Sequence, residues 1–182
     1  MTGRPADGPL VWNVAGLLAE DPGAERDYEV RDVEIDLGED LSLADPIEGR
    51  VHLARTNRGI LASVDVHAAL ALQCSRCLRD ISFPVDARFQ EEYLPSLDLA
   101  SGRPLPADDE PDVLRLNDHH ELDLETPVRE AIQLAEPIAP VCRPDCPGLC
   151  VVCGGRLDEG VHDHPDEDID PRLEALRAFR PD

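Results

Sequence analysis

The chain of 182 residues carries a formal net charge of −22 at pH 7, because 39 Asp and Glu residues outnumber 17 basic residues, all of them Arg. This charge repels phosphate backbones, so it argues against a protein that grips DNA or RNA through a basic face. It favours a basic protein partner, and taken alone it also fits a role in solubility. Aromatic residues make up only 3% of the chain. We therefore expect one core built from Leu, Val, Ile and Ala.

The first twenty residues contain no basic region followed by an apolar stretch, which is the pattern of a secretory signal. No apolar run approaches the length needed to cross a membrane. We therefore expect a cytoplasmic protein without a membrane partner. In that compartment thiols stay reduced, and clustered cysteines bind metal more often than they form disulfides.

Apolar and polar residues alternate in the first half of the chain, over residues 33–37, 47–53, 63–74 and 81–89. A period of two is typical of half-buried antiparallel strands. The last two stretches flank the motif CSRC, so Cys74 and Cys77 are predicted to lie at the tip of a hairpin. Pro84 cannot donate a ladder hydrogen bond, which predicts that the returning strand lies at an edge of the sheet.

Residues 95–112 are rich in Pro and acidic residues, which predicts a loop. A helix is predicted next, with Thr126 as its N-cap, Pro127 at its first position and Pro137 beyond its end. A terminal helix is predicted from Asp170, where Pro171 follows a capping residue. Its apolar stripe, which we expect to dock on the protein, consists of Leu173, Leu176 and Phe179.

These elements predict an α+β fold with a mainly antiparallel, curled or barrel-like sheet, a few short helices and a C-terminal zinc-knuckle segment. Three parts are expected. Residues 1–94 form the β module with the hairpin, 95–118 an acidic Pro-rich loop, and 119–182 the helix, the knuckle segment and the terminal helix. The first and third parts are expected to fold as one cooperative domain.

The chain gathers soft metal ligands in two CxxC pairs, one CxxxC pair and one HxH pair. They are Cys74, Cys77, Cys142, Cys146, Cys150, Cys153, His162 and His164. Thiolates three residues apart can hold one ion where the chain turns tightly, and Gly154 and Gly155 permit such a turn. Eight nitrogen and sulfur donors would fill two tetrahedral zinc sites, so one or two structural Zn²⁺ ions are predicted.

Other interpretations of these residues exist. Cys74 and Cys77 could be small buried strand residues, and His162 and His164 could be solvated residues of an acidic segment. A redox CxxC usually lies at a helix N-terminus, whereas CVVCGG is typical of a turn.

His119-x-Glu121 upstream of Cys150-x-x-Cys153 loosely matches the zinc deaminase signature. Leu149 stands where that signature has Pro. A deaminase also keeps an open zinc position for water, whereas eight donors would close both sites. We therefore predict no catalytic residues and no enzymatic activity.

Three stretches of the chain resemble the YceD family, the large ribosomal RNA subunit accumulation proteins. They are CSRCL, LDLETPVREAIQLAEPIAPVCRPDCPGLCVVCGGRLDEG and DIDPRLEALRAF. The resemblance also extends to the opening segment VWNVAGLLAEDPGAERDYEV. It implies a non-enzymatic role in the accumulation of large-subunit ribosomal RNA or in assembly of that subunit. The implied partner is a basic large-subunit ribosomal protein or a pre-ribosomal particle. Direct RNA contact would need the arginines gathered on one face, namely Arg50, Arg55, Arg58, Arg76 and Arg79.

The resemblance also bears on the ligand sets. Longer relatives carry C-x-C where this chain has His162-x-His164, an exchange that preserves zinc binding, and they favour GxNLN where this chain has GGRLDEG. Shorter relatives keep the first CxxC but lack the second. The implied partition is one site from Cys74, Cys77, Cys142 and Cys146, and another from Cys150, Cys153, His162 and His164.

Two other partitions stay open, because spacing does not decide which distant pairs meet. One joins the two CxxC pairs, and the other makes a single site from the four later cysteines. The alternative function is a zinc-dependent thiol redox switch or a chaperone-like binding protein.

Overall fold

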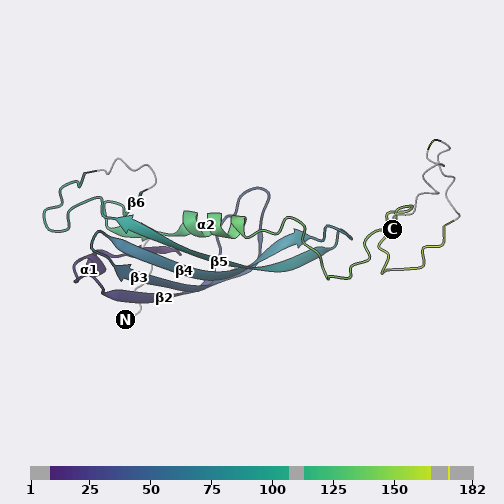
Figure 1. The fold of residues 1–182 in the computed structure, drawn as a ribbon, viewed down its shortest axis with the longest axis horizontal. Coiled ribbons are helices and arrows are strands. Elements are labelled where there is room, and N and C mark those ends of the chain that lie inside the picture. The colour runs from purple at the N-terminus through teal and green to yellow at the C-terminus, as the bar shows by residue number, and fades with distance from the viewer. Residues whose placement is uncertain (1–8, 107–112, 165–171, 173–182) are drawn as a thin grey trace, which may run out of the picture.

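The computed structural model describes residues 9–106, 113–164 and 172. An open five-stranded sheet in the order β2-β3-β4-β5-β6 forms the body, and α2 lies along one face of it (Figure 1). The strands of this sheet are β2 (Glu25–Val33), β3 (Leu43–Arg55), β4 (Ile60–Gln73), β5 (Asp80–Leu94) and β6 (Leu114–Arg115). The remaining elements are β1 (Val11–Asn13), α1 (Ala15–Leu18), β7 (Glu121–Asp123) and α2 (Glu125–Leu134).

The hairpin of β4 and β5 is the longest element of the sheet. The two strands pair in an unbroken antiparallel register from Ile60↔Tyr93 to Gln73↔Asp80. On β4 every second residue from Ile60 to Leu70 is buried, as the period of two predicts. The hairpin therefore carries the motif CSRC at its tip, as expected.

The sheet departs from the expected pattern near its first strand. Alternation over residues 33–37 predicts a strand, but β2 ends at Val33. The register with β3 shifts between Val30 and Val33, and Asp32 adopts a φ of 55°, so the strand ends there. Leu37 is nevertheless buried, so the alternating pattern correctly indicated a buried residue in a segment that is not a strand.

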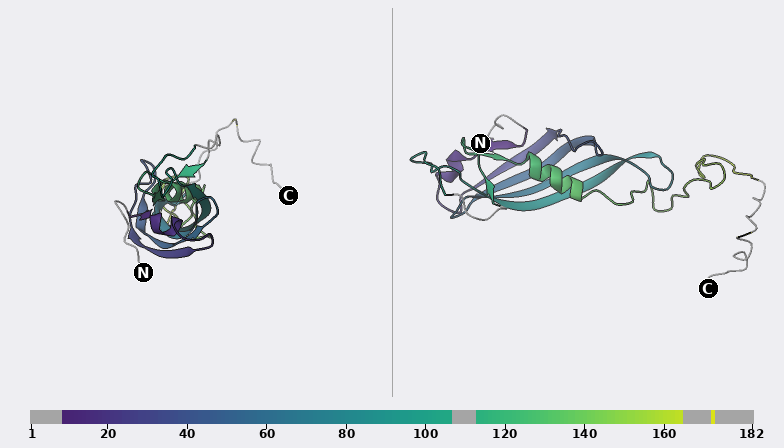
Figure 2. Two further views of the ribbon diagram at one scale, coloured as in Figure 1. Left: turned by 90° about the vertical axis from the view of Figure 1, so that its left-hand side faces the viewer. Right: turned by 90° about the horizontal axis from the view of Figure 1, so that it is seen from above.

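The sheet is curled but does not close into a barrel within the described residues. Its edge strands are β2 and β6. It curves around α2, which is clear in the view along the long axis (Figure 2, left). β6 is parallel to β5 and pairs only with Tyr93 and Leu94. In the part of the chain that the structure describes, β5 is therefore an edge along the stretch that contains Pro84.

α2 is held by its apolar side, where Val128 and Ile132 are fully buried. The predicted N-cap is wrong. Thr126 lies inside the first turn, and Leu124 is the cap residue. The carboxylate of Asp123 accepts a hydrogen bond from the Glu125 amide at 2.9 Å, so an acidic side chain one residue earlier serves this end.

The N-terminal segment and the segment before α2 share one hydrophobic cluster with the sheet. β1 pairs with β7, which places Trp12 opposite Leu122, and both are buried.

The predicted loop 95–118 contains β6 and an isolated bridge between Leu97 and Pro104. No helix among the described residues has the length and apolar character needed to cross a bilayer.

Beyond α2 the chain leaves the body and runs past the tip of the β4–β5 hairpin (Figures 1 and 2). A second, small cluster forms there from Cys74, Cys77 and Cys146, with Val141 and Leu149 packed against it. The predicted terminal helix, with its apolar stripe, lies outside the described residues.

Candidate metal centres

The first centre begins in the turn that joins β4 to β5. The Cys74 amide donates to the Arg79 carbonyl at 2.8 Å, and the Leu78 amide donates to the Cys74 carbonyl at 2.9 Å. Leu78 takes a φ of 54°, a left-handed conformation that closes the turn. Both thiols of the turn, on Cys74 and Cys77, are fully buried.

Polar contacts hold the segment after α2 against this turn. The amide and the hydroxyl of Ser75 both donate to the Pro140 carbonyl, at 2.8 and 2.9 Å. The Arg76 guanidinium donates to the carbonyls of Pro144 and Cys146, at 3.1 and 3.2 Å. These contacts bring Cys142 and Cys146 over the turn.

The four thiols of this centre form a compact group. Sγ of Cys74 lies 3.8 Å from Sγ of Cys146, and Sγ of Cys77 lies 3.8 Å from Sγ of Cys142. All four sulfur atoms lie within 4.8 Å of one another, and all are free cysteines. A tetrahedral zinc ion with Zn–S bonds of about 2.3 Å requires sulfur atoms about 3.8 Å apart, whereas a disulfide requires about 2.05 Å. The spacing fits a metal ion and not disulfides.

The thiols of this group differ in acidity. Hydrogen bonding from the Cys142 backbone, with further contributions from the turn, lowers the pKa of Cys74 to about 6 against the effect of burial. Burial, followed by the neighbouring thiols, raises the pKa of Cys142 to about 12. Burial and the crowding of thiols therefore oppose the build-up of negative charge in this group, and a bound cation would balance that charge.

The second centre is built on a second tight turn. The Cys150 amide donates to the Gly155 carbonyl at 2.7 Å, and the Gly154 amide donates to the Cys150 carbonyl at 2.9 Å. Gly154 has a φ of 70°, which a residue without Cβ adopts at little cost. Leu149 and Arg156 form an antiparallel bridge across the base of the turn.

Each of the two histidines places one ring nitrogen at this centre. His162 Nδ1 lies 3.4 Å from Cys153 Sγ, while its Nε2 lies 2.9 Å from the Arg156 carbonyl. A carbonyl only accepts, so Nε2 carries the proton and Nδ1 is left with a free lone pair. His164 Nε2 is buried without a hydrogen-bond partner. An unpaired buried nitrogen on a histidine that belongs to this group fits a metal ligand.

The structure brings all eight predicted residues together in two groups of four. The groups are Cys74, Cys77, Cys142 and Cys146, and Cys150, Cys153, His162 and His164. This is the partition that the resemblance implied, and neither of the other two partitions occurs. Sequence reasoning did not assign a role in positioning the cysteines to Ser75, Arg76 or Arg156, whose contacts shape the two centres. Their position within or next to the cysteine motifs was the only available signal.

The deaminase-like pair belongs to neither group. His119 offers its carbonyl to the Asn13 side chain at 2.8 Å, and Glu121 lies in β7. The Glu121 carboxylate accepts from Asn117 Nδ2 at 2.7 Å. These residues support the β1–β7 ribbon.

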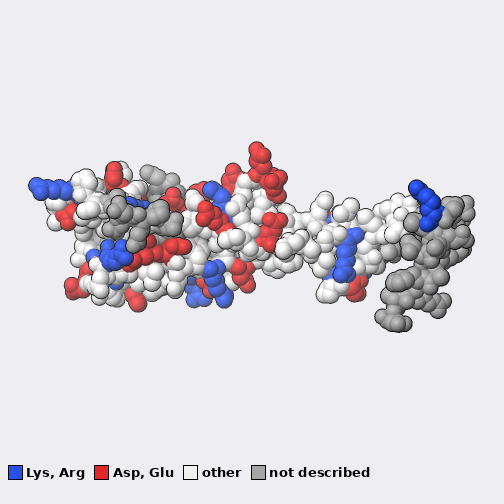
Figure 3. Space-filling model, turned by 45° about the horizontal axis from the view of Figure 1, so that its top comes forward, with Lys and Arg blue, Asp and Glu red and all other residues white. Residues whose placement is uncertain are grey.

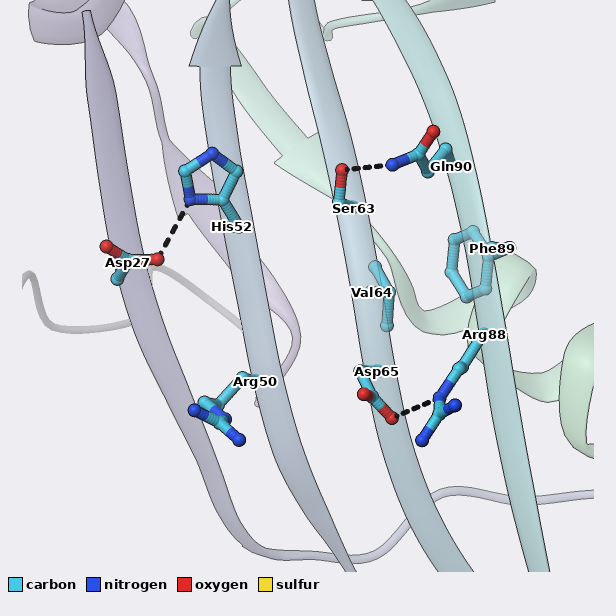
Figure 4. Close-up of a pocket in the computed structure, with 9 residues that line it drawn as sticks. All are labelled: Asp27, Arg50, His52, Ser63, Val64, Asp65, Arg88, Phe89 and Gln90. Carbon is cyan, nitrogen blue, oxygen red and sulfur yellow. Dashed lines mark hydrogen bonds and ion pairs between the residues drawn. The ribbon is translucent and has the colours of Figure 1, made fainter.

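The arginines that direct RNA binding would need on one face are dispersed. Arg55, at the end of β3, donates to the Leu18 and Gly59 carbonyls. Arg76 lies in the turn that joins β4 to β5, at the opposite end of β4 from Arg55. Arg50 lies on the outer face of the sheet, in a shallow groove of about 660 Å³ (Figure 4).

That groove is lined by side chains that largely satisfy one another. Asp27 lies 2.9 Å from His52, and Arg88 donates to Asp65 at 3.0 Å. Gln90 donates to the Ser63 hydroxyl, also at 3.0 Å. Such cross-strand rows of paired charges are typical of a solvated sheet face.

Comparison with known proteins places the chain. Residues 62–180 match the family described as "Large ribosomal RNA subunit accumulation protein YceD". Uncharacterized proteins of Mycobacterium bovis and Mycobacterium tuberculosis are 38% identical over 121 residues, which is 66% of this chain and 55% of each relative. An uncharacterized protein of Mycobacterium leprae is 46% identical over 52 residues, 28% of this chain and 23% of the relative.

The chain spans about half the length of the first of these curated relatives. No solved structure matches it. The family match covers 62–180, well over half of the chain, and includes every residue of both candidate centres. The chain therefore belongs to the YceD family.

Proposed function

We propose that this protein is a non-enzymatic factor for the accumulation of large-subunit ribosomal RNA, organised by two structural Zn²⁺ ions. The observation that carries the proposal is the family match over residues 62–180, within which both groups of donors lie. The family description supports the ribosomal role. The geometry of the donor atoms supports metal binding.

The donor sets support zinc in a structural role. One centre offers four sulfur atoms and the other two sulfur and two nitrogen atoms. Four protein ligands close a tetrahedral zinc site and leave no position for a reactive water. Soft thiolate ligands also discriminate against Mg²⁺ and Ca²⁺. Both features favour a protein whose metal holds it together over one whose metal performs chemistry.

The first centre would connect two distant parts of the chain. Cys74 and Cys77 belong to the hairpin, and Cys142 and Cys146 to the segment after α2. Among the described residues, the apolar side chains that pack in this small cluster, apart from the cysteines, are Ile81, Val141 and Leu149. A structural zinc contributes on the order of 10 kcal/mol, which is enough to decide whether such a segment folds.

Charge supports a cationic client. Acidic side chains are spread over the body formed by the sheet and α2 (Figure 3). We propose that the acidic body recruits a basic large-subunit ribosomal protein, alone or within a pre-ribosomal particle. Attraction of this kind accelerates encounter and weakens with salt. Equal recovery of basic ribosomal proteins at low and high salt in a pull-down would contradict this mechanism.

The ribosomal role is tested in cells that depend on this protein. Depletion is expected to lower the ratio of large-subunit to small-subunit ribosomal RNA, and the wild-type chain is expected to restore it. Cys74→Ser should fail to restore the ratio. His119→Ala, which changes a histidine outside both centres, is the matched control and should succeed. An unchanged ratio after depletion would overturn the proposed function.

A second candidate function has one specific observation in its favour. Cys153 is exposed, whereas the other cysteines are buried or half-buried, so the second centre is open to oxidants. A thiol switch or chaperone-like binding protein would release this metal under mild oxidant and change its partner binding. Metal release without any change in binding would exclude that function.

A further inference from the structure

We infer that Arg156 couples the two metal centres, so that filling the first centre raises the affinity of the second. The inference rests on the metal binding in the proposed function and concerns how the two sites depend on each other. The eight donor residues would bind the metal ions, and Arg156 is not one of them. Arg156 is a positioning residue that contacts a ligand-bearing residue of each centre.

The second centre is attached to the first by few contacts. Gly148, with a φ of 82°, runs against the first turn so closely that a Cβ there would lie 3.3 Å from the Arg76 carbonyl. Leu149 packs against the buried thiols of the first centre. Past Cys150 the segment is largely exposed, with Val151 at 96% and Val161 at 94%. Apolar burial therefore contributes little to the order of this segment, and polar contacts and metal must supply the rest.

Arg156 makes the contact that joins the centres most directly. Its guanidinium Nε donates to the carbonyl of Cys77, a ligand residue of the first centre, at 3.0 Å. Its own carbonyl accepts from Nε2 of His162, a ligand residue of the second centre, at 2.9 Å. One residue thus forms a hydrogen bond with the backbone of the first centre and fixes the ring orientation and tautomer of a ligand in the second centre.

Neighbouring charges hold the Arg156 side chain in place. Its Nη1 donates to Glu159 at 3.1 Å, and Glu159 also accepts from Arg79 of the first turn at 2.9 Å. Arg79 reaches Asp158 as well, at 3.2 Å. The ion pairs therefore run from the first turn to the second centre and converge on the same short segment.

The Cys77 carbonyl can accept the hydrogen bond from Arg156 only while the turn keeps its conformation. Its orientation depends on the turn at Leu78, whose φ of 54° is unfavourable for a residue with a Cβ. A cation that holds both thiolates of the turn would maintain this conformation. Without a cation the turn can relax, Arg156 loses its acceptor, and the Arg156 carbonyl no longer orients His162. Coupling between two binding equilibria is reciprocal, so filling the second centre must strengthen the first by the same factor.

The test uses Co²⁺ as an optical probe on the full chain, prepared without metal under reducing conditions. A site of four sulfur ligands and a site of two sulfur and two nitrogen ligands differ in their visible absorption, so each occupancy is read separately. The dissociation constant of the second centre is measured in the wild type and in Cys142→Ser, which disables the first centre but leaves Cys77 unchanged. We expect the second centre to bind about tenfold more weakly in Cys142→Ser, within the usual range of coupling factors.

Arg156→Ala separates positioning from simple stability. It removes the guanidinium and with it the contact to the Cys77 carbonyl, while the four ligands of the second centre stay in place, so this centre should still bind metal, about as weakly as in Cys142→Ser. In the Arg156→Ala background, the affinity of the second centre should be the same with and without Cys142→Ser. Arg143→Ala is the matched control, because Arg143 belongs to the same charged cluster through its ion pairs with Asp145 and Asp158. It should keep the coupling.

Three results would overturn the inference. They are equal affinities of the second centre in the wild type and Cys142→Ser, coupling that survives Arg156→Ala, and coupling that Arg143→Ala removes as fully as Arg156→Ala does. Independent binding at two intact sites would leave the proposed function standing. A chain that binds no metal at either site would contradict the metal part of the proposed function as well.

Discussion

Cys74 and Cys146 place their sulfur atoms 3.8 Å apart across 72 residues of sequence. The contact joins the tip of the β4–β5 hairpin to the segment that follows α2. Two elements with little shared apolar surface thus meet at a group of four thiols. A metal ion there would hold together parts of the chain that packing alone joins weakly.

The two centres should release metal at different rates. Three residues of the first centre are buried and one is half-buried, whereas the second centre contains the exposed Cys153 and two half-buried histidines. With a strong chelator and a colorimetric zinc indicator, we expect a fast phase and a slow phase. Cys153→Ser should remove the fast phase and Cys74→Ser the slow one. A single phase in the wild type, or loss of the slow phase in Cys153→Ser, would contradict the assignment.

Leu78→Gly should stabilise the first centre. Leu78 is held at a φ of 54°, and its side chain is 54% exposed, so little burial is lost on substitution. Relief of the left-handed strain is expected to raise the free energy of unfolding by about 1 kcal/mol. Chemical denaturation of the metal-loaded chain measures this. Leu99→Gly, at another exposed leucine, is the control and should give no gain.

The ion pairs between the centres should depend on pH. Hydrogen bonds from Arg156 and then Arg79 hold the pKa of Glu159 below its ordinary value of 4.5. A depressed folded-state pKa stabilises the protein above the ordinary pKa, and this stabilisation is lost as pH falls through the folded-state value. Glu159→Gln should therefore lower stability at pH 7, and the difference from wild type should shrink in acid. Urea unfolding from pH 7 downward checks this.

Glu136→Gln serves as the control for that series, because Glu136 is exposed and lies in the segment after α2. It should match the wild type throughout. A difference for Glu159→Gln that grows in acid would mean that the carboxylate destabilises the fold.

The docking of α2 should contribute strongly to the stability of the body. Ile132 is fully buried against the sheet, whereas Leu134 on the same helix is 87% exposed. Ile132→Ala is expected to cost about 2–5 kcal/mol, through lost burial and the cavity left behind. Leu134→Ala should change stability by less than about 0.5 kcal/mol. Thermal unfolding of both variants measures the contrast, and equal effects would contradict the observed packing.

Much of this architecture follows from short-range patterns. The alternation of apolar residues on β4 and the two tight cysteine turns depend on neighbours in the chain, so the sequence predicts them. The end of β2 does not follow, because the register shift beside Asp32 depends on pairing with β3. The N-cap at Leu124 was missed because Asp123, and not Thr126, satisfies the helix amide.

The pairing of distant cysteines could not be derived from the residues alone. Spacing allowed three partitions, and contacts such as those of Ser75 and Arg76 with the later segment bring Cys142 and Cys146 to the first turn. Similarly, nothing local in the sequence assigns Arg156 to the Cys77 carbonyl. Such contacts depend on the path of the chain after α2.

Metal content per chain, measured by elemental analysis of the native protein purified under reducing conditions, tests the central claim most directly. We predict two equivalents of zinc in the wild type. Cys74→Ser should lose the first-centre equivalent, while Cys150→Ser should lose the second-centre equivalent and keep the other. A native chain with free thiols and no metal, or with its cysteines joined as disulfides, would contradict the account.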